Sequence, residues 1–477
     1  MFVKNSFEYD ARVDKEAVSL TEAGHEVTVV AIHVPGVTAE RETTPEGVNV
    51  VRVSRLSFGM GTIQKVQRGM VTGIEERRSR LTGEEVQAER IDRYGRLLKA
   101  STATPGDDSA RRYVPPERVE APEPSRLRRR WGAITTPILR IGYQFVRLMY
   151  RIVRPLFIWQ TRGLRTWTIN RRFIRAGLET GADVWHSHDL NTLYIGWKCK
   201  KKRPGTKLVY DSHELQTERN RMGKVARWWA TWNEKRGLPH TDARIWTTDS
   251  RARYVVEKYG IPYPTILRNV PEIIEIEEGW DLRERLDIPA DQRVLVYQGS
   301  IQENRGIEEA IEAVASHLED CVLVVIGYGH HRPVLEEMVT ERGLDDRVKF
   351  FGPIPNDELL FYTASADVGL CTIKGNSLSY RWSLPNKLFE YMMAGIPIVA
   401  SDYEEMGRVV REEGVGTVCD PGDPESVAAA VRGIVEDPEA EERFRAATRT
   451  AIQKYNWGVE EQVLLGLYEG LVGANGE

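Results

Sequence analysis

A lysine and a glutamate stand three residues apart where a helix should begin in the segment SLPNKLFEYMMAGIPIVAS, residues 383–401. Pro385 is typical of a first helical turn, and residues three apart share one helix face, so Lys387 and Glu390 should be neighbours. The helix N-terminus and the lysine suit a phosphate, and the carboxylate suits the hydroxyls of a ribose. An ion pair on a surface helix is the alternative, but the flanking residues are too apolar for an exposed helix.

Two glycine-containing loops follow predicted strands and offer further phosphate-binding groups. In VYQGSIQENRGIEEAIEAV a helix should begin near Gly306, where free N–H groups and the Arg305 guanidinium can hold a phosphate. In VVIGYGHHRPVLEEM, Gly327 and Gly329 would let a ligand approach the backbone closely. The alternative is that both loops are ordinary turns and that the arginine is solvated.

Histidines and acids end two further predicted strands, DVWHSHDL and LVYDSHEL. His186 and His188 face the same side of their strand, but four zinc ligands are not evident and no cysteine is near, so we expect no metal. We expect the polar side chains here to orient a sugar or a hydroxyl acceptor at the carboxyl ends of the strands. These side chains are His188, Asp189, His213 and Glu214. Asp189 alternatively caps the following helix.

Strands and helices alternate along most of the chain, which indicates parallel sheets covered by helices on both faces. Strands are predicted at 26–34, 47–56, 183–189, 207–213, 243–248, 265–269, 293–300, 321–327, 347–352, 367–373 and 396–401. These are about twice as many as one doubly wound sheet needs. The expected fold is therefore α/β, with two doubly wound parallel-sheet, Rossmann-like domains facing a cleft. A first strand in MFVKN would be very short, which raises the question whether the sequence starts a few residues late.

The expected domains are 1–275, which should bind the acceptor, and 276–455, which should bind a nucleotide. The linker-like NVPEIIEIEEG separates them, and an amphipathic helix in 456–477 should return to the first domain. Residues 57–130 are rich in Arg, Glu, Gly, Ser and Pro and predict a flexible insertion.

Residues 131–176 form the second part of this insertion and hold nine arginines, no lysine and no acid. A basic amphipathic helix with aromatics is predicted, kinked or ended by Pro155. The pattern favours a membrane surface, and the alternative is an apolar face packed on the domain with the arginines in water.

Bulk composition narrows the class of protein. The chain has 477 residues, 41% of them hydrophobic, and a net charge of −4, which fits a folded protein that does not bind nucleic acid through bulk charge. Its four cysteines are scattered, which favours a reduced, intracellular protein without a structural zinc. Neither a signal peptide nor a membrane-spanning run is evident.

Taken together, these motifs resemble family 4 glycosyltransferases, the retaining two-domain GT-B enzymes that use nucleotide-sugar donors. The resemblance covers residues 1–56 and about 180–477, through DARVDKEAVSLTEAGHEVTVV, HSHD, YDSHE, GSIQENRGIEEAI, IGYG and FFGPIPNDELLFYTASADVGL. LPNKLFEYMMAGIPIVAS is the most specific block and is similar to the subgroup that builds surface polysaccharides and lipid-linked glycans. Such enzymes need no metal or other cofactor, and no DxD-like site follows a strand here.

The resemblance also implies roles for individual residues. Those implied in catalysis are His188, Arg305 and Lys387; in donor binding, Gly299, Ser300, Gly327, Gly329, Asn386 and Glu390; on the acceptor side, Arg12, Asp189, His213 and Glu214. Two positions depart from the family. Trp382 stands where many members have a glutamate, and Ser300 and Arg305 replace the usual Arg–Lys pair.

The implied reaction moves a hexose from a UDP- or GDP-sugar to a hydroxyl of a glycan or lipid-linked acceptor. The implied place is the cytoplasm, with 131–176 as the contact to the inner face of the membrane. Two alternatives stay open: a nucleotide-sugar epimerase of the same architecture, and a non-catalytic nucleotide-sugar-binding protein, for which Trp382 and Ser300 leave room.

Overall fold

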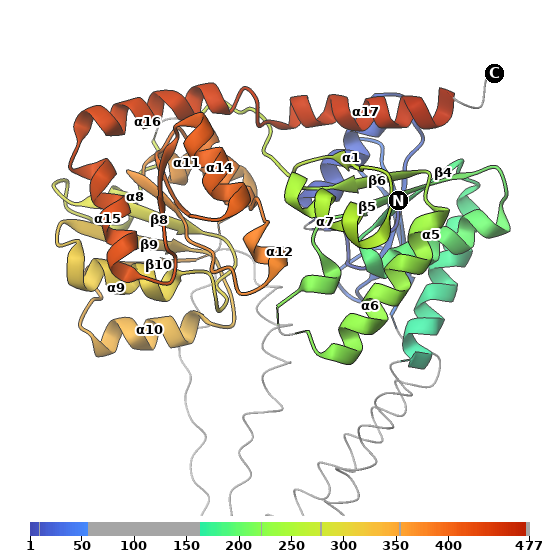
Figure 1. Cartoon of the computed structure of the whole chain (residues 1–477), viewed down its shortest axis with the longest axis horizontal. Helices are drawn as coiled ribbons and strands as arrows, with labels where there is room; N and C mark the ends of the chain where they lie inside the picture. Colours follow the sequence, from blue (N-terminus) through green and yellow to red (C-terminus); the bar gives the residue numbers. More distant parts are fainter. Residues whose placement is uncertain (9, 56–162, 221, 277–278, 353, 474–477) are drawn as a thin grey trace, which may run out of the picture. The chain divides into compact units, whose positions relative to one another are not determined.

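The computed structural model describes residues 1–8, 10–55, 163–220, 222–276, 279–352 and 354–473. The chain divides into two compact units, Met1–Val53 with Arg171–Glu477, and Ser54–Asn170. The second unit lies almost wholly outside the described residues, as does the predicted insertion 57–130 and most of 131–176. The first unit contains three sheets with their helices (Figure 1).

Two short sheets, joined by a bridging residue, make the first domain. Its strands are β1 (Thr28–His33), β2 (Arg41–Thr43), β3 (Asn49–Ser54), β4 (Val184–His188), β5 (Lys207–Ser212), β6 (Ala243–Trp246) and β7 (Thr265–Ile266). Its helices are α1 (Ala11–Glu22), α5 (Leu190–Lys202), α6 (Lys224–Gly237) and α7 (Asp249–Tyr259), with 3-10 turns η2 (Gln216–Glu218) and η3 (Leu238–His240). The strand orders are β1-β3-β2 and β4-β5-β6-β7.

Phe2 joins these two sheets, since it pairs in parallel with Val30 of β1 on one side and with Ser187 of β4 on the other. Its N–H donates to the His186 carbonyl at 2.8 Å, and its carbonyl accepts from the His188 N–H at 3.2 Å. β1 therefore lies on one side of Phe2, and β4 lies on the other side. Such a reversal of strand order is where open α/β sheets bind their ligands, beyond the carboxyl ends of the strands.

The second domain is one parallel sheet of order β10-β9-β8-β11-β12-β13. Its strands are β8 (Arg293–Gln298), β9 (Cys321–Ile326), β10 (Val348–Phe351), β11 (Val368–Cys371), β12 (Ile398–Ser401) and β13 (Gly416–Cys419). Its helices are α8 (Leu282–Leu286), α9 (Ile307–His317), α10 (Arg332–Glu341), α11 (Asn356–Ala364), α12 (Leu378–Arg381), α13 (Asn386–Met393), α14 (Glu404–Glu413), α15 (Pro424–Val435) and α16 (Pro438–Ala451). The order reverses between β8 and β11, which makes this a doubly wound sheet.

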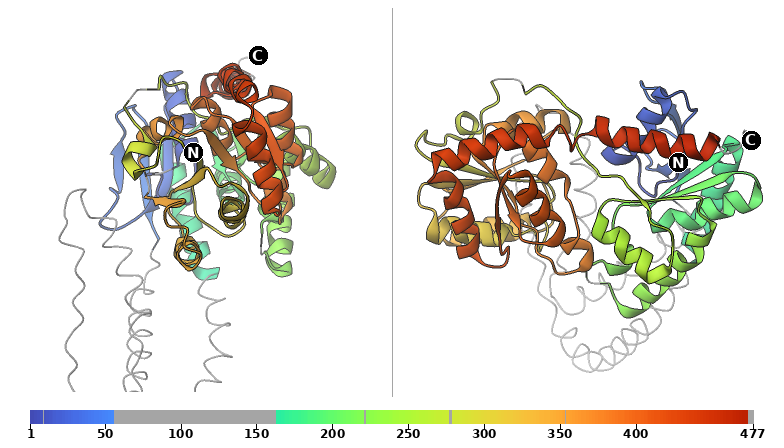
Figure 2. Two further views of the ribbon diagram at one scale, coloured as in Figure 1. Left: turned by 90° about the vertical axis from the view of Figure 1, so that its left-hand side faces the viewer. Right: turned by 45° about the horizontal axis from the view of Figure 1, so that its top comes forward.

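Alternate residues of β8 face two separate hydrophobic cores. Val294 and Val296 pack with residues of α13 and α14, whereas Leu295 and Tyr297 pack with residues of α9, α10 and α15. Helices accordingly lie on both faces of the sheet in Figures 1 and 2. The predicted α/β architecture of two doubly wound domains is confirmed.

The last helix, α17 (Trp457–Gly473), packs against α1 and completes the core of the first domain (Figure 1). Trp457, Leu464 and Tyr468 belong to that core, and the Trp457 indole donates to Ser19 Oγ at 2.9 Å. Glu460 binds the backbone N–H and the guanidinium of Arg268, at 2.7 and 2.8 Å. The chain thus returns to the first domain next to Arg268, near the residues at which it left that domain for the second one.

The short strands β2 and β13 were not among the predicted ones. β2 pairs antiparallel with β3, its residues are all exposed, and β13 lies at the edge of its sheet, so neither has the apolar run that marks a buried strand. Of the arginine-rich segment 131–176, residues up to 162 lie outside the described part. The described residues of this segment, 163–176, belong to a helix over 163–180, in which Ile169, Phe173 and Ala176 are buried. Among the described helices none is both long enough and apolar enough to cross a membrane.

Replacing Trp457 by alanine should lower the free energy of unfolding by about 3–5 kcal/mol, since a buried indole and its hydrogen bond to Ser19 are lost. Urea denaturation of the full chain measures this. Val472→Ser, in the exposed last turn of α17, is the control and should change little. A Trp457→Ala protein as stable as the wild type would contradict the assignment of α17 to the first core.

Candidate active site

The strand reversal of the second domain lies between β8 and β11, and helix α13 closes over it. The Tyr391 hydroxyl of α13 lies 3.2 Å from the carbonyl oxygens of Val296 and Leu370, one on each strand. Pro385 is the N-cap of α13, and six of the eight helix residues are buried, among them Lys387. The helix start is therefore fixed at the carboxyl ends of both strands, as the sequence suggested.

Lys387 is a buried cation without a counter-charge in contact. Its side-chain nitrogen has no hydrogen-bond partner among the described residues and lies 3.4 Å from the ring centroid of Tyr297. Burial, and to a smaller extent Arg305, lower the pKa of this ammonium to about 7. The alternative, an ion pair with Glu390 on a surface helix, is wrong: Lys387 is buried and its nitrogen makes no hydrogen bond to Glu390.

Arg305 is the second cation at this edge. It precedes Gly306, the N-cap of α9, and lies over the Tyr380 ring at 5.2 Å, with its Nε atom buried and unbonded among the described residues. Gly306 has φ of +74°, and a Cβ there would overlap the Thr372 carbonyl after β11. The loops after β8 and β11 are therefore in contact beside the free N–H groups of α9. Two under-bonded cations and a helix N-terminus together form an anion-binding arrangement.

Glu390 is held by a buried amide. Gln298, the last residue of β8, donates through Nε2 to Glu390 Oε2, and its Oε1 accepts from the Thr363 hydroxyl at 2.7 Å. This chain fixes the carboxylate rotamer. Burial raises the pKa of Glu390, although Gln298 and Lys387 oppose the shift.

Gly327 and Gly329 lie where the loops after β8 and β9 run side by side. Their backbones are tied by bonds from Gly299 N to Ile326 O and from Ile301 N to Tyr328 O, at 3.0 and 2.9 Å. A Cβ on Gly327 or on Gly329 would overlap the carbonyl of Gly299 or of Ile301, respectively. Packing of one loop on the other is thus sufficient reason for both glycines, which leaves their place in a base pocket a prediction.

The other donor-side residues are more open. Gly299, Ser300 and Asn386 are exposed, and a Cβ on Gly299 would come within 3.9 Å of the Lys387 nitrogen. Trp382 follows α12, packs its ring against Tyr254 with centroids 5.5 Å apart, and accepts a hydrogen bond from Thr248 at its carbonyl. Trp382 therefore contributes an aromatic contact at this position and no carboxylate.

A buried ion pair organises the carboxyl edge of the first sheet. Arg12 of α1 donates through Nε and Nη2 to both carboxylate oxygens of Asp211 on β5, at 2.9–3.1 Å, and through Nη1 to the Leu267 carbonyl at 3.1 Å. Arg12 is 3% and Asp211 0% exposed, so Arg12 is bound inside the domain rather than offered to an acceptor. Although burial alone would raise it, Arg12 holds the pKa of Asp211 well below its usual range.

Two of the predicted histidines converge on this carboxylate. His213 Nε2 lies 3.2 Å and His188 Nδ1 3.4 Å from Asp211 Oδ2. Burial would lower the pKa of His213, but the Asp211 and Asp189 carboxylates outweigh it and raise the pKa to about 9. Burial lowers the pKa of His188, whose Nε2 has no partner among the described residues. His188 is 2% exposed, so access to it would need movement of its surroundings.

Asp189 occupies the N-cap position of α5, but its side chain makes no cap hydrogen bond, so the capping alternative is wrong. It accepts instead from the His213 N–H at 3.3 Å and from Gln216 at 3.2 Å, with its backbone at φ of +63°. Glu214 binds Gln216 and Arg219, at 3.2 and 3.1 Å. These residues form a polar rim next to His213.

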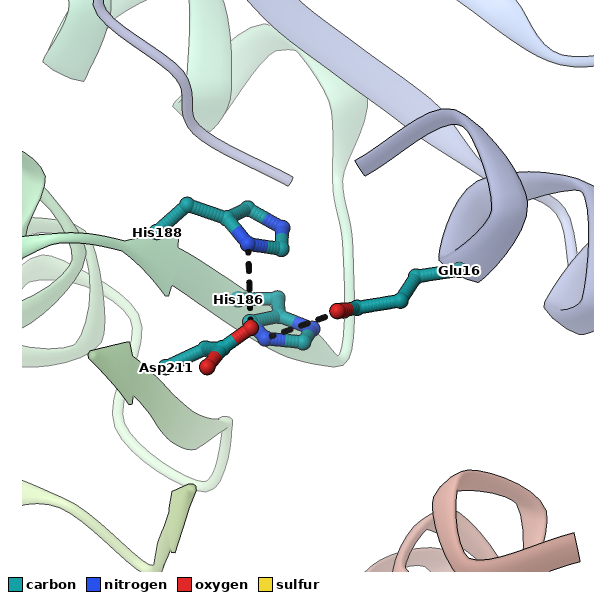
Figure 3. Close-up of side chains that lie close together, drawn as sticks. All are labelled: Glu16, His186, His188 and Asp211. Carbon is teal, nitrogen blue, oxygen red and sulfur yellow. Dashed lines mark ion pairs between the residues drawn. The ribbon is translucent and has the colours of Figure 1, made fainter. Parts of the chain in front are cut away.

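Four buried side chains of this domain could offer ligands to a metal: Glu16, His186, His188 and Asp211 (Figure 3). Their ligand atoms lie within 4.8 Å of one another, and the imidazoles of His186 and His188 stack at 4.2 Å. Arg12 fits this interpretation poorly, since its guanidinium already takes both oxygens of Asp211 and lies 3.0 Å from Glu16. A divalent cation would be placed against a fixed positive charge.

Several residues of these networks were not singled out from the sequence. They are Glu16, Asp211, Gln298 and Thr363. An acid within the buried strand LVYDSH, and Glu16 one helical turn after Arg12, are the signals that could have indicated the first two. Gln298 and Thr363 lie 65 residues apart, and nothing in the sequence pairs them.

Comparison with known proteins finds two family models that match separate parts of the chain. The family described as Glycosyl transferases group 1 matches residues 279–451, and the family described as Glycosyltransferase Family 4 matches residues 105–269. A D-inositol 3-phosphate glycosyltransferase of Xylanimonas cellulosilytica is 24% identical over 60% of this chain and 71% of its own. A phosphatidyl-myo-inositol mannosyltransferase of Mycobacterium leprae is 24% identical over 60% and 73%. A putative colanic acid biosynthesis glycosyl transferase of Escherichia coli is 31% identical over 44% and 53%.

Solved structures show the same fold. Sucrose-phosphate synthase from Thermosynechococcus elongatus superposes with a TM-score of 0.63, at 17% identity, over 97% of this chain and 93% of its own. The Anabaena protein HepE in complex with UDP-glucose superposes with a TM-score of 0.52, at 17% identity, over 64% and 82%.

The buried carboxyl of Glu16 gives a testable dependence of stability on pH. Burial and the neighbouring Asp211 raise its pKa from 4.5 to about 8, although the Arg12 guanidinium, 3.0 Å from Glu16 Oε1, opposes the shift. The folded protein then holds a proton that the unfolded chain releases above about pH 4.5. This group's contribution to stability is therefore present below that pH and is lost as the pH rises through 8.

Glu16→Gln cannot titrate, so its stability relative to the wild type should increase from pH 5 to pH 8, by at most about 1.4 kcal/mol per pH unit. Urea denaturation at several pH values measures the difference. Glu257→Gln, on an exposed position of α7, is the control and should follow the wild type. A constant difference between Glu16→Gln and the wild type would show that Glu16 is ionised in the fold.

Proposed function

The chain belongs to the family 4 glycosyltransferases and has the GT-B fold, and from this premise we propose that it moves a hexose from a nucleoside-diphosphate sugar to a hydroxyl of a glycan or lipid-linked acceptor. The observation that carries the proposal is the Lys387 ammonium, which is buried, unbonded and next to Arg305 at a helix N-terminus. An unpaired buried charge is costly to a fold, so a role in binding an anion accounts for its presence.

The donor diphosphate would bind between Arg305, Lys387 and the first N–H groups of α9. These groups are placed before the donor arrives, so they stabilise the negative charge that develops on the departing phosphate. Glu390, oriented by Gln298, would accept from the ribose hydroxyls. Gly327 and Gly329 would line the base pocket, and Gly299, Ser300 and Asn386 the exposed edge around the phosphates.

In the proposed retaining reaction the bond from the anomeric carbon to the diphosphate oxygen breaks, and a bond to the acceptor oxygen forms on the same face. The acceptor proton passes to the leaving phosphate, so no protein base is required. His188, held by Asp211 and His213, would orient the sugar or the acceptor through its unpartnered Nε2. Asp189, His213 and Glu214 would form the acceptor side, and Arg12 would position Asp211.

The named relatives agree with this class of reaction. HepE was solved with UDP-glucose, and the bacterial relatives are named as a D-inositol 3-phosphate glycosyltransferase, a phosphatidyl-myo-inositol mannosyltransferase and a putative colanic acid biosynthesis glycosyl transferase. The three bacterial relatives are named as transferases, so neither the epimerase nor the non-catalytic alternative finds support in their names. The segment 131–176, through which we expect a membrane contact, is described only from residue 163 onward.

Lys387→Met should raise the Kd for nucleoside diphosphates by at least about a hundredfold and reduce turnover, because the central cation of the site is gone. The unliganded variant should nevertheless be as stable as the wild type or more stable, since an unpaired buried charge has been removed. Titration calorimetry and urea denaturation measure the two effects. A variant that is destabilised and still binds the diphosphate would assign Lys387 to the core instead.

The wild-type affinity for a nucleoside diphosphate should fall as the pH rises above about 7, since Lys387 then loses the charge that binds the ligand. The slope should approach tenfold per pH unit at most. Lys387→Met should lack this component, so the ratio of variant to wild-type Kd should shrink between pH 6.5 and pH 8.5. Lys454→Met, at a 60% exposed lysine, is the control and should keep the wild-type profile.

We also propose that transfer needs no metal. Exhaustive treatment with EDTA, followed by assay with added magnesium, manganese or zinc, should leave the rate of transfer unchanged. A loss restored by one of these ions would refute this, and the Glu16→Gln variant would then tell whether the cluster in Figure 3 binds the ion.

A further inference from the structure

Helix α6 of the first domain presents an apolar stripe to solvent instead of to the core. Val225, Trp228, Trp229 and Trp232 follow the helical spacing i, i+3, i+4, i+7 and are 80%, 62%, 55% and 39% exposed. Amphipathic helices normally bury such a stripe. Three of the four exposed tryptophans of the described chain belong to this one helix, so the exposure is concentrated and not scattered.

The stripe continues onto the neighbouring helix α5 through an arginine. The Arg236 guanidinium lies over Trp232 of α6 at 5.1 Å and over Trp197 of α5 at 5.5 Å. Tyr194 packs edge-on against Trp197 with centroids 6.0 Å apart, and Trp229 stacks on Trp232 at 5.1 Å. We call these residues the α5–α6 aromatic surface: Tyr194, Trp197, Val225, Trp228, Trp229 and Trp232.

Nearly all charged residues of helices α5 and α6 are basic. The basic residues of the two helices are Lys198, Lys200, Lys201, Lys202, Lys224, Arg227, Lys235 and Arg236. The only acid in either helix is Glu234, which is 3% exposed and accepts from the hydroxyls of Tyr210 and Tyr259. Lys200 and Arg227 are paired with Asp242 and Glu218, and Lys198 and Arg236 lie over aromatic rings. The exposed cations that remain are Lys201, Lys202, Lys224 and Lys235.

From the outward apolar stripe and its cationic border we infer that the α5–α6 aromatic surface binds an anionic lipid bilayer. Tryptophan is the side chain most suited to the headgroup region, where its ring is buried and its N–H remains hydrated. Surrounding lysines and arginines gain from the negative surface potential of the bilayer. A second copy of the same surface would set like charges against each other, which disfavours a symmetric dimer.

Nucleic acid carries the same negative charge, but it offers no apolar region that would bury Val225, the most exposed residue of the stripe. The bilayer thus accounts for both the aliphatic and the aromatic members of the surface. The inference concerns residues separate from 131–176, and it does not depend on the donor site.

Co-sedimentation of the full-length protein with vesicles tests the inference. The vesicles are phosphatidylcholine alone and phosphatidylcholine mixed with phosphatidylglycerol. The wild type should bind the mixed vesicles, and Trp228→Ser/Trp229→Ser should lower the partition coefficient by about tenfold or more. Val334→Ser, which removes an apolar group 54% exposed on α10, is the matched control and should bind as the wild type does.

Both substituted tryptophans are largely exposed, so unfolding is not the expected cause of a loss. Urea denaturation and the Kd for a nucleoside diphosphate should match the wild type, which separates this result from any failure of the donor site. Brominated phospholipids should quench the tryptophan fluorescence of the wild type more than that of the variant, as contact with the acyl boundary requires.

Three outcomes would overturn the inference. Equal vesicle binding by the double variant would place attachment elsewhere in the chain. Sedimentation velocity that shows a dimer dissociated by the substitutions, without vesicle binding, would make the surface a contact between copies. Tight binding of single-stranded DNA that depends on these tryptophans, again without vesicle binding, would assign the surface to nucleic acid.

Discussion

The buried pair of Arg12 and Asp211 is the interaction on which the carboxyl edge of the first sheet depends. It joins α1 to β5 and, through the Leu267 carbonyl, to the end of β7. Asp211 in turn holds His213 and His188 in place. Pairing in a low-dielectric interior is worth little in net stability, but it fixes geometry, because either partner alone would be a bare buried charge.

In the second domain the buried charge of Lys387 is unpaired, unlike the paired charges of Arg12 and Asp211. Lys387 and Arg305 lie at the start of two helices, near enough for Arg305 to lower the pKa of Lys387, and the described structure gives the lysine nitrogen no partner. In the first domain Arg12 and Asp211 satisfy each other and keep neighbouring side chains in position. In the second, the charge is left for a ligand to satisfy, which is how a site can gain affinity and pay for it in stability.

The sequence predicted the parts that local patterns encode: the strands, the two doubly wound domains, and Lys387 and Glu390 at a helix start. It did not predict pairings between distant residues, such as Gln298 with Glu390 and Thr363, because register and packing decide them. The glycines of IGYG show a different limit. Glycines can allow the close approach of a ligand or the close packing of two loops. The sequence is the same in both cases, and only the structure, in which the Gly299 and Ile301 carbonyls lie against these glycines, shows the loop packing. Trp228 and Trp229 are not distinguished by the sequence pattern, because the helical period alone does not tell which face of a helix is exposed.

The return of α17 into the first core has a consequence for synthesis of the protein. Strands β1 to β7 leave the ribosome well before Trp457, Leu464 and Tyr468, which complete their core. Roughly 190 residues separate Arg268 from Trp457, so translation delays completion by about 10–40 s. During that time the second domain can fold as a unit while the first lacks one side of its core. The protein is therefore a case in which the domain made first is finished last, and chaperone binding would be most useful to the amino-terminal half.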